Sequence, residues 1–394
     1  MAPLDMSTWR RALDFDAPSR QFRTQWSNPS DVFSILLILG GDIIGLALAQ
    51  LAGSHFTPVA FSFGWVAYSI SSLVAALGSN KLMPLNSDCK CMVINGISGY
   101  SRDNSSWVIG RMVRDIDHWA GEKTRARVEK NIADRWQRSK VKNPNASKPT
   151  RAGLVVSVYE PSKTLESGVQ QRDWLYWSGI STMVLQLGLA AIPLGVYGDW
   201  SVLMLTVAGT LLALITGSLS QWRREKWACR RFSETPYILT EGNGAQHVIL
   251  VLGNGHGLNL EDLATGQTGK ENDKENKAWL YLSGLAIPWI ILLITATGIE
   301  DHTWYLVGMG SLGIVQNVVV AGAVREPRAQ GIPLDPVAVY GDASVMQTLY
   351  IVEDKYPGIG RRLRDEFFQG RLRDDEVAKW DALKERKLSG IVPN

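Results

Sequence analysis

Lysine and arginine are missing from three long stretches of this chain, Asp31–Asn80, Asp173–Trp222 and Ala278–Val324. Each stretch holds two apolar runs of about 20 residues separated by a short polar break, and a helix of that length rises roughly 30 Å, the thickness of a bilayer's hydrocarbon core. The pattern argues against a water-soluble fold for these segments and predicts six transmembrane helices. Their expected ranges are 32–53, 58–79, 175–196, 201–221, 279–298 and 303–324.

Cysteine is also scarce. The chain has three, Cys89, Cys91 and Cys229, an odd number that argues against a disulfide framework, and Cys89-x-Cys91 without further ligands is too sparse for a zinc site. Residues 253–257 are glycine-rich but lack the spacing of dinucleotide or P-loop motifs. We therefore expect neither a metal nor a cofactor. The net charge of +3 gives no reason to expect a nucleic-acid partner.

All 41 basic residues lie outside the three windows. Under the positive-inside rule the segments that carry them are cytosolic, both termini included. The sequence thus predicts an all-α polytopic membrane protein of six transmembrane helices in three hairpins, with a small cytosolic α/β cap from the loops and an amphipathic helical tail. The expected parts are an N-terminal segment (1–30), three transmembrane hairpins (31–80, 173–222 and 278–324), two cytosolic loops (81–172 and 223–277) and a cytosolic tail (325–394).

The loops and the tail carry their own patterns. Residues 154–159 and 246–252 are apolar and rich in β-branched side chains, which favours strands. The tail from about Ala343 to Leu388 is amphipathic and predicts helices, interrupted at Tyr356-Pro357-Gly358.

Asp42 is the most informative residue of the first window. It stands about ten residues into the first predicted span, roughly 15 Å deep by helix rise, where an ionised carboxylate costs at least about 2.5–3.5 kcal/mol. We expect it to face the bundle interior as a neutral acid. A buried hydrogen-bonding strut between helices is the alternative interpretation.

Other polar and aromatic residues stand at a similar depth in the remaining spans, and we expect them to line a pocket near the midplane. They are Trp65, Tyr68, Gln186, Trp289, Gln316 and Asn317. Taken singly, each is more often a packing residue or an interhelical hydrogen-bonding residue. A second polar group lies in the short loops of the opposite interface, where Glu300 follows an apolar run and could point into the mouth of the bundle.

Several short segments resemble a family of fungal integral-membrane terpene cyclases from meroterpenoid pathways of the ascofuranone, ascochlorin and macrophorin type. They are Gly41-Asp42-Ile43-Ile44 with Ala49-Gln50-Leu51, the run from Pro58 to Trp65, Gly110-Arg111 with Arg114-Asp115, and Tyr356-Pro357-Gly358. The resemblance implies a lipophilic prenylated substrate within membrane lipid, cyclised by acid-initiated carbocation chemistry as an isomerase of secondary metabolism. It also fits a multi-pass protein of an endomembrane such as the endoplasmic reticulum.

On this interpretation Asp42 is the first candidate for the proton donor and Glu300 the second. The aromatic residues would stabilise carbocations, and the amides would orient the donor or bind the substrate's oxygens. Two other functions stay open: a proton- or cation-coupled transporter in which Asp42 lies on the ion path, and a membrane scaffold whose loops and tail bind partners.

Overall fold

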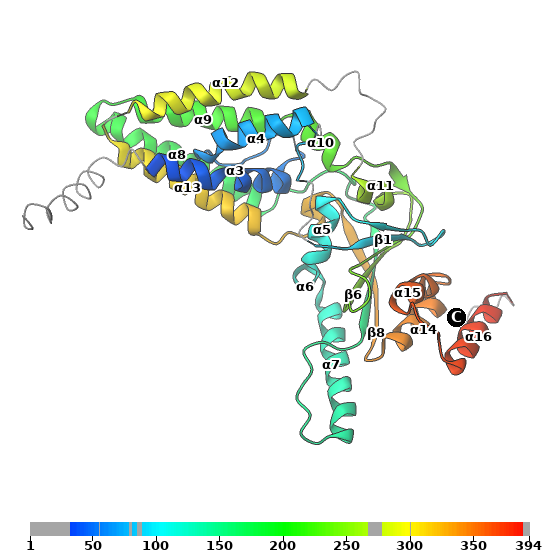
Figure 1. Cartoon of the computed structure of the whole chain (residues 1–394). Coiled ribbons are helices and arrows are strands. Elements are labelled where there is room, and N and C mark those ends of the chain that lie inside the picture. The colour runs from blue at the N-terminus through cyan, green and yellow to red at the C-terminus, as the bar shows by residue number, and fades with distance from the viewer. Residues whose placement is uncertain are drawn as a thin grey trace, which may run out of the picture. The chain divides into compact units, whose positions relative to one another are not determined.

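The computed structural model describes residues 32–54, 56–78, 81–84, 89–266, 278–299 and 301–388 (Figure 1). The predicted N-terminal segment, 1–30, lies outside these ranges. The chain divides into two compact units. The helical unit is drawn from residues 1–82, 173–222 and 274–323, and the sheet unit from residues 83–172, 223–273 and 324–394.

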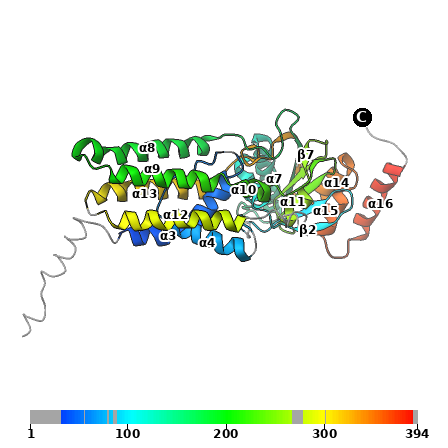
Figure 2. The same ribbon diagram turned by 90° about the horizontal axis from the view of Figure 1, so that it is seen from above.

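Two helical hairpins form much of the helical unit. They consist of α8 (Trp174–Tyr197) with α9 (Ser201–Gly217), which is followed by the short α10 (Ser220–Lys226), and of α12 (Ala278–Thr297) with α13 (Thr303–Gly322). The Asp173 carboxylate accepts a hydrogen bond from the Tyr176 backbone N–H at the start of α8, and Gly198 ends this helix in the left-handed conformation. Figure 2 shows the four long helices running side by side.

The prediction of six transmembrane helices in an all-α protein is wrong. Among the helices that the structure describes, three are long and apolar enough to cross a bilayer, namely Trp174–Tyr197, Trp279–Thr297 and Thr303–Gly322. A fourth is added if α9 and α10, bent by 41°, count as one span. A six-stranded sheet in the other unit excludes the all-α class.

The first predicted hairpin is replaced by a re-entrant arrangement. Helix α3 (Val32–Leu51) is followed by residues 56–63, most of which belong to neither a helix nor a strand, and by the 15-residue helix α4 (Gly64–Gly78). A Cβ on Gly40 would lie 2.5 Å from Gly64 Cα, and a Cβ on Gly45 would lie 3.5 Å from the Tyr68 ring, so α3 and α4 run in the same direction. The predicted span 58–79 is therefore wrong, because α4 starts halfway along α3.

The end of α3 lies beside the ends of α9 and α13. Gln50 Nε2 donates to Ala323 O at 2.8 Å, and Thr57 Oγ1 donates to Gly217 O at 2.9 Å. Helix α3 thus begins at the end of the bundle where α8 turns into α9. In the predicted hairpin it would begin at the opposite end.

The sheet unit is built on a mixed sheet with the strand order β2-β1-β5-β6-β3-β8. Strands β3 and β6 are parallel and the other neighbours are antiparallel. The strands are β1 (Met92–Asn95), β2 (Ser101–Asp103), β3 (Leu154–Pro161), β5 (Tyr237–Thr240), β6 (His247–Val251) and β8 (Leu334–Asp342), and a separate pair joins β4 (Arg231–Ser233) to β7 (Gly257–Leu258). Strands occur at the two predicted places, and β8 adds one that the prediction of a helical tail lacked.

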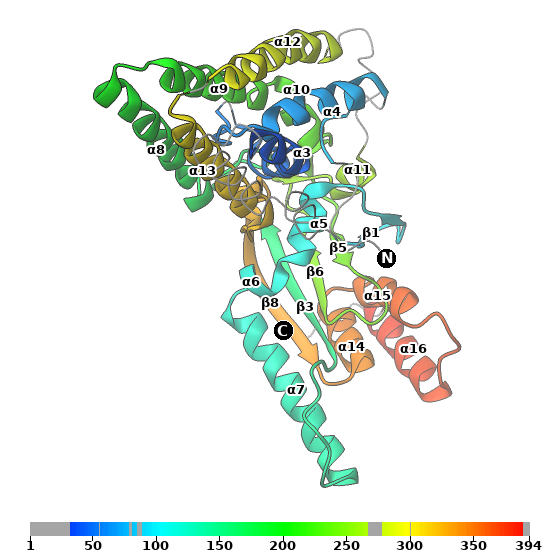
Figure 3. The same cartoon turned by 60° about the vertical axis from the view of Figure 1, so that its left-hand side comes forward.

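Helices cover both faces of this sheet, with α7 (Glu122–Lys142) and α14 (Val345–Lys355) on opposite sides (Figure 3). Side chains alternate along β3: Val156 and Val158 join the apolar core with Leu349 of α14, whereas Ser157 bonds Thr124 of α7 at 3.0 Å. Each fully buried Leu or Val in such a core contributes roughly 1.5–3 kcal/mol. The other helices of the unit are α5 (Trp107–Arg114), α6 (Ile116–Trp119), α11 (Leu260–Thr265), α15 (Ile359–Phe367) and α16 (Asp374–Leu388), with a 3-10 turn at Pro327–Gln330.

Candidate functional site

The structure brings the predicted pocket residues into the centre of the helical unit. Trp65, Gln186 and Trp289 are fully buried, and Tyr68, Gln316 and Asn317 are at most 9% exposed. Around them lies the segment 56–63, which we call the re-entrant leg. Its residues from Thr57 to Phe63 are all buried.

Aromatic rings form a continuous array along α4 and the re-entrant leg. Trp65 stacks on Trp289 with ring centroids 5.5 Å apart, and Trp289 stacks on Phe61 at 6.0 Å. Tyr68 meets Trp65 edge-on at 5.8 Å, and Phe63 meets Phe61 edge-on at 5.7 Å. Such pairs contribute about 0.5–1.5 kcal/mol each beyond the area they bury.

Two buried amides hold the backbone of the re-entrant leg. Gln186 Nε2 donates to Phe61 O at 2.7 Å and to Met309 O at 2.9 Å, and Asn317 Nδ2 donates to Ala60 O at 3.0 Å. Backbone outside a helix does not pair its carbonyls as a helix does, so these side chains satisfy the carbonyls of Ala60 and Phe61, which would otherwise be buried unpaired.

The third predicted amide, Gln316, has a different partner. Its Nε2 donates to Ser178 Oγ at 2.9 Å, which joins α13 to α8. This contact links two long helices, so Gln316 supports the helices around the leg and Gln186 and Asn317 support the leg itself.

Three glycines let the leg approach the surrounding helices. A Cβ on Gly179 of α8 would lie 2.1 Å from Pro58 O, and one on Gly313 of α13 would lie 1.8 Å from Phe61 O. A Cβ on Gly209 of α9 would lie 2.5 Å from the Phe61 ring. The leg therefore occupies a space that glycine leaves open on all three helices.

Asp42 is exposed on α3, so the expectation that it faces the bundle interior is wrong. Its neighbours Gly41 and Gly45 face α4, where a Cβ would lie 3.2 Å from Ala67 and 3.5 Å from Tyr68. Asp42 therefore lies outside the contact between α3 and α4. It is within one helical turn of Gly45, which faces the Tyr68 ring at one end of the aromatic array.

Glu300, the second candidate donor, lies outside the described residues. Nearby, the two hairpin turns are joined by His302 Nδ1 and Asp199 Oδ2 at 3.1 Å, and the His302 ring stacks on Tyr197 at 4.2 Å. Hydrogen bonds from Ser201, with a smaller contribution from His302, hold the pKa of Asp199 below its usual value.

The sequence interpretation missed the re-entrant leg itself. Residues 58–79 are mostly apolar, and hydropathy does not distinguish a buried non-helical leg from a helix. The sequence features that could have indicated the leg are the amides of Gln186 and Asn317. The interpretation assigned them to the substrate, whereas they bind backbone carbonyls of the leg.

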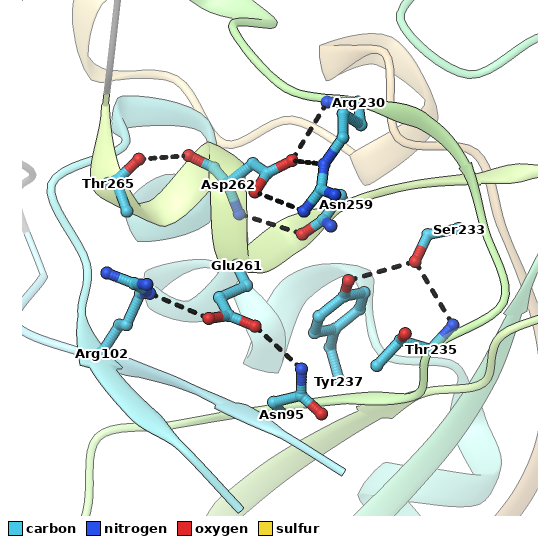
Figure 4. Close-up of polar contacts among 10 residues, drawn as sticks. All are labelled: Asn95, Arg102, Arg230, Ser233, Thr235, Tyr237, Asn259, Glu261, Asp262 and Thr265. Atoms are coloured by element: carbon cyan, nitrogen blue, oxygen red, sulfur yellow. Dashed lines mark hydrogen bonds and ion pairs between the residues drawn. The ribbon is translucent and has the colours of Figure 1, made fainter. Parts of the chain in front are cut away.

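A second polar cluster lies in the sheet unit around α11 (Figure 4). Glu261 accepts hydrogen bonds from Arg102 Nε at 3.0 Å and from Asn95 Nδ2 at 2.8 Å, while Asp262 forms a bidentate pair with Arg230 at 2.7 and 3.0 Å. Burial would raise the pKa of Asp262, but the hydrogen bonds from Arg230 outweigh it and lower the pKa. Each carboxylate is paired with an arginine, which is typical of ion pairs that stabilise a fold.

No protein-family model, curated protein or solved structure matches the chain.

Proposed function

We propose that this chain is an integral membrane protein whose apolar helices cross a bilayer and whose sheet unit lies on the cytosolic side. The three helices long and apolar enough to cross support the first part. The second part is supported by charge, since 37 of the 41 basic residues follow residue 80 and avoid the helical windows (41 less Arg10, Arg11, Arg20 and Arg23).

Within that membrane protein we propose a terpene cyclase that isomerises a farnesylated phenolic epoxide or alkene. The observation that carries the proposal is the position of Asp42, exposed on an apolar helix beside the turn that contacts Tyr68. A substrate dissolved in lipid reaches an exposed carboxyl sideways, without crossing water. Tyr68 is the ring of the aromatic array closest to this turn, and an electron-rich ring beside the reacting chain would stabilise a carbocation.

The proposed reaction is balanced without a co-reactant. The Asp42 carboxyl, in its acid form, gives its proton to the epoxide oxygen or the terminal alkene, and the resulting cation is attacked by the next double bond of the chain. The last cation then loses a proton, and the Asp42 carboxylate takes one up, so the acid is regenerated and the product is an isomer of the substrate.

The second candidate function is a proton- or cation-coupled transporter, and the re-entrant leg favours it. Irregular backbone at membrane depth is tolerated where protein buries it or where it lines a pathway. Transporters form substrate and ion sites from half-helices whose ends lie near the midplane, and α4 starts halfway along α3.

Microsomes that contain the wild-type chain, Asp42→Asn or the control Asp301→Asn test the proposal. Each is given a farnesylated phenolic epoxide, and mass spectrometry and NMR are used to detect a cyclic isomer. We expect the isomer from wild type and Asp301→Asn, and a loss of about 10²–10⁴-fold in Asp42→Asn, the usual contribution of a general acid. Absence of the isomer from wild type across a panel of such epoxides would refute the cyclase and favour transport, to be measured as proton flux in liposomes.

A further inference from the structure

An open groove of about 580 Å³ lies in the sheet unit, and none of its residues belongs to the sites described above. Its walls are Arg135 of α7, the loop 151–153 before β3, the first turn of α14, and the start of α16. Gly153 adopts φ +66°, and a Cβ there would lie 1.9 Å from Asp342 O, so glycine lets this loop close against the end of β8.

Positive charge dominates the groove. It is lined by two carboxylates, Asp375 and Glu376, and by four cations, Arg135, Arg151, Arg373 and Lys379. Both carboxylates are already paired with Arg373, at 3.6 and 2.8 Å. The groove therefore has a net charge of +2, and three of its cations are not paired with its own carboxylates.

These three cations differ in what else they contact. Within the described part of the chain, Arg135 and Arg151 form no ion pair with a carboxylate. Lys379 donates to the neutral Gln347 amide at 3.3 Å and lies 4.1 Å from the centre of the Tyr350 ring. The two arginines are thus available for an anion, with the lysine at the opposite wall.

The first turn of α14 adds backbone donors to the same groove. Ser344 precedes the helix in extended conformation, and its side chain does not cap it. The N–H of Ser344 bonds Asp342 Oδ1 at 2.8 Å, whereas no described residue accepts from the N–H groups of Val345, Met346 and Gln347. The positive end of an 11-residue helix thus faces the groove together with the two arginines.

We propose that this groove binds a phosphate group. Arginines from two different elements, a lysine and three backbone N–H groups suit the several oxygens and the double charge of a phosphate monoester or diphosphate. The site is built from the sheet unit alone, so it does not depend on the proposed function. The phosphate belongs either to a soluble compound or to a lipid headgroup, and both carry the same chemistry.

Binding is measured on the full chain at pH 7.5. One arm titrates pyrophosphate by calorimetry into the chain in phosphatidylcholine nanodiscs, and the other measures binding of the chain, in detergent, to vesicles with or without phosphatidic acid. The variants are Arg151→Gln and Arg135→Gln, with Lys142→Gln of the same α7 helix as a control that removes equal charge outside the groove. Val345→Pro removes one backbone donor at a position where a helix accepts proline, and it should weaken binding as well.

We expect pyrophosphate, phosphatidic acid vesicles or both to bind, with affinity lowered about tenfold or more by Arg151→Gln and Arg135→Gln and little changed by Lys142→Gln. Binding of pyrophosphate identifies a soluble source, and binding only to phosphatidic acid identifies a lipid headgroup. Failure of both probes would overturn the proposal. So would an equal loss in Lys142→Gln, because the attraction would then be that of a basic surface rather than of a site.

Discussion

Gly313→Ala should destabilise the helical unit by displacing the re-entrant leg. The new Cβ would lie 1.8 Å from Phe61 O, whereas a relaxed C···O contact is about 3.3 Å, so the carbonyl must retreat by about 1.5 Å. That movement breaks the 2.7 Å hydrogen bond from Gln186. An unsatisfied buried group costs about 1–3 kcal/mol and overpacking a further 1–3 kcal/mol. The higher helix propensity of alanine offsets up to about 1 kcal/mol, which leaves a net loss of about 1–5 kcal/mol.

Gly188→Ala is the matched control. Gly188 lies within α8, is exposed, and has no atom within 4 Å of the place that a Cβ would take, so alanine there keeps only the gain in propensity. Equilibrium unfolding of both variants in mixed dodecylmaltoside and SDS micelles, followed by tryptophan fluorescence, gives the two free energies of unfolding. If the two variants agree within about 0.5 kcal/mol, the leg does not lie against α13 and the re-entrant arrangement is incorrect.

Two further predictions concern pH and topology. Burial lowers the pKa of His247, although Asp117 opposes the shift, so protonation is disfavoured in the folded state and stability should fall as the pH drops below the unfolded value of about 6.5. The melting temperature should fall between pH 7.5 and 5.5 in wild type and in the variant of an exposed histidine, His118→Gln. It should fall less in His247→Gln, and an equal fall in that variant would contradict the assignment. In a cysteine-free background, Ser54→Cys and Gly78→Cys should react with an impermeant thiol reagent from the same face of the membrane, whereas an ordinary hairpin places them on opposite faces.

The hairpins α8–α9 and α12–α13 could be predicted because short polar breaks interrupt apolar runs, which is the signal that hydropathy detects. The first window could not, because its second apolar run becomes a leg and a half-helix through contacts with Gly179, Gly209 and Gly313 from elsewhere in the chain. Those contacts are invisible in a local window.

In the sheet unit, too, some strands are indicated by their own residues, whereas another depends on its position in the sheet. Strands β3 and β6 are apolar and β-branched, so their own residues indicate them. Strand β8 contains Asp335 and Pro336, which argue against a strand, yet it lies at the sheet's edge, where proline is tolerated.

For Asp42, the depth along the helix could be predicted from the sequence, but the face of the helix could not. Its face depends on which row of residues along α3 packs against the neighbouring helices. The stripe formed by Gly40, Ile44, Ala47 and Leu51 is buried, and at 100° per residue Asp42 lies about 160° from Ile44. The flanking pair Gly41 and Gly45 is only partly buried, and both residues face α4. In the proposed membrane arrangement an exposed carboxyl at this depth meets lipid or a lipid-soluble ligand, which is why the Asp42→Asn assay tests the placement of the site as well as its chemistry.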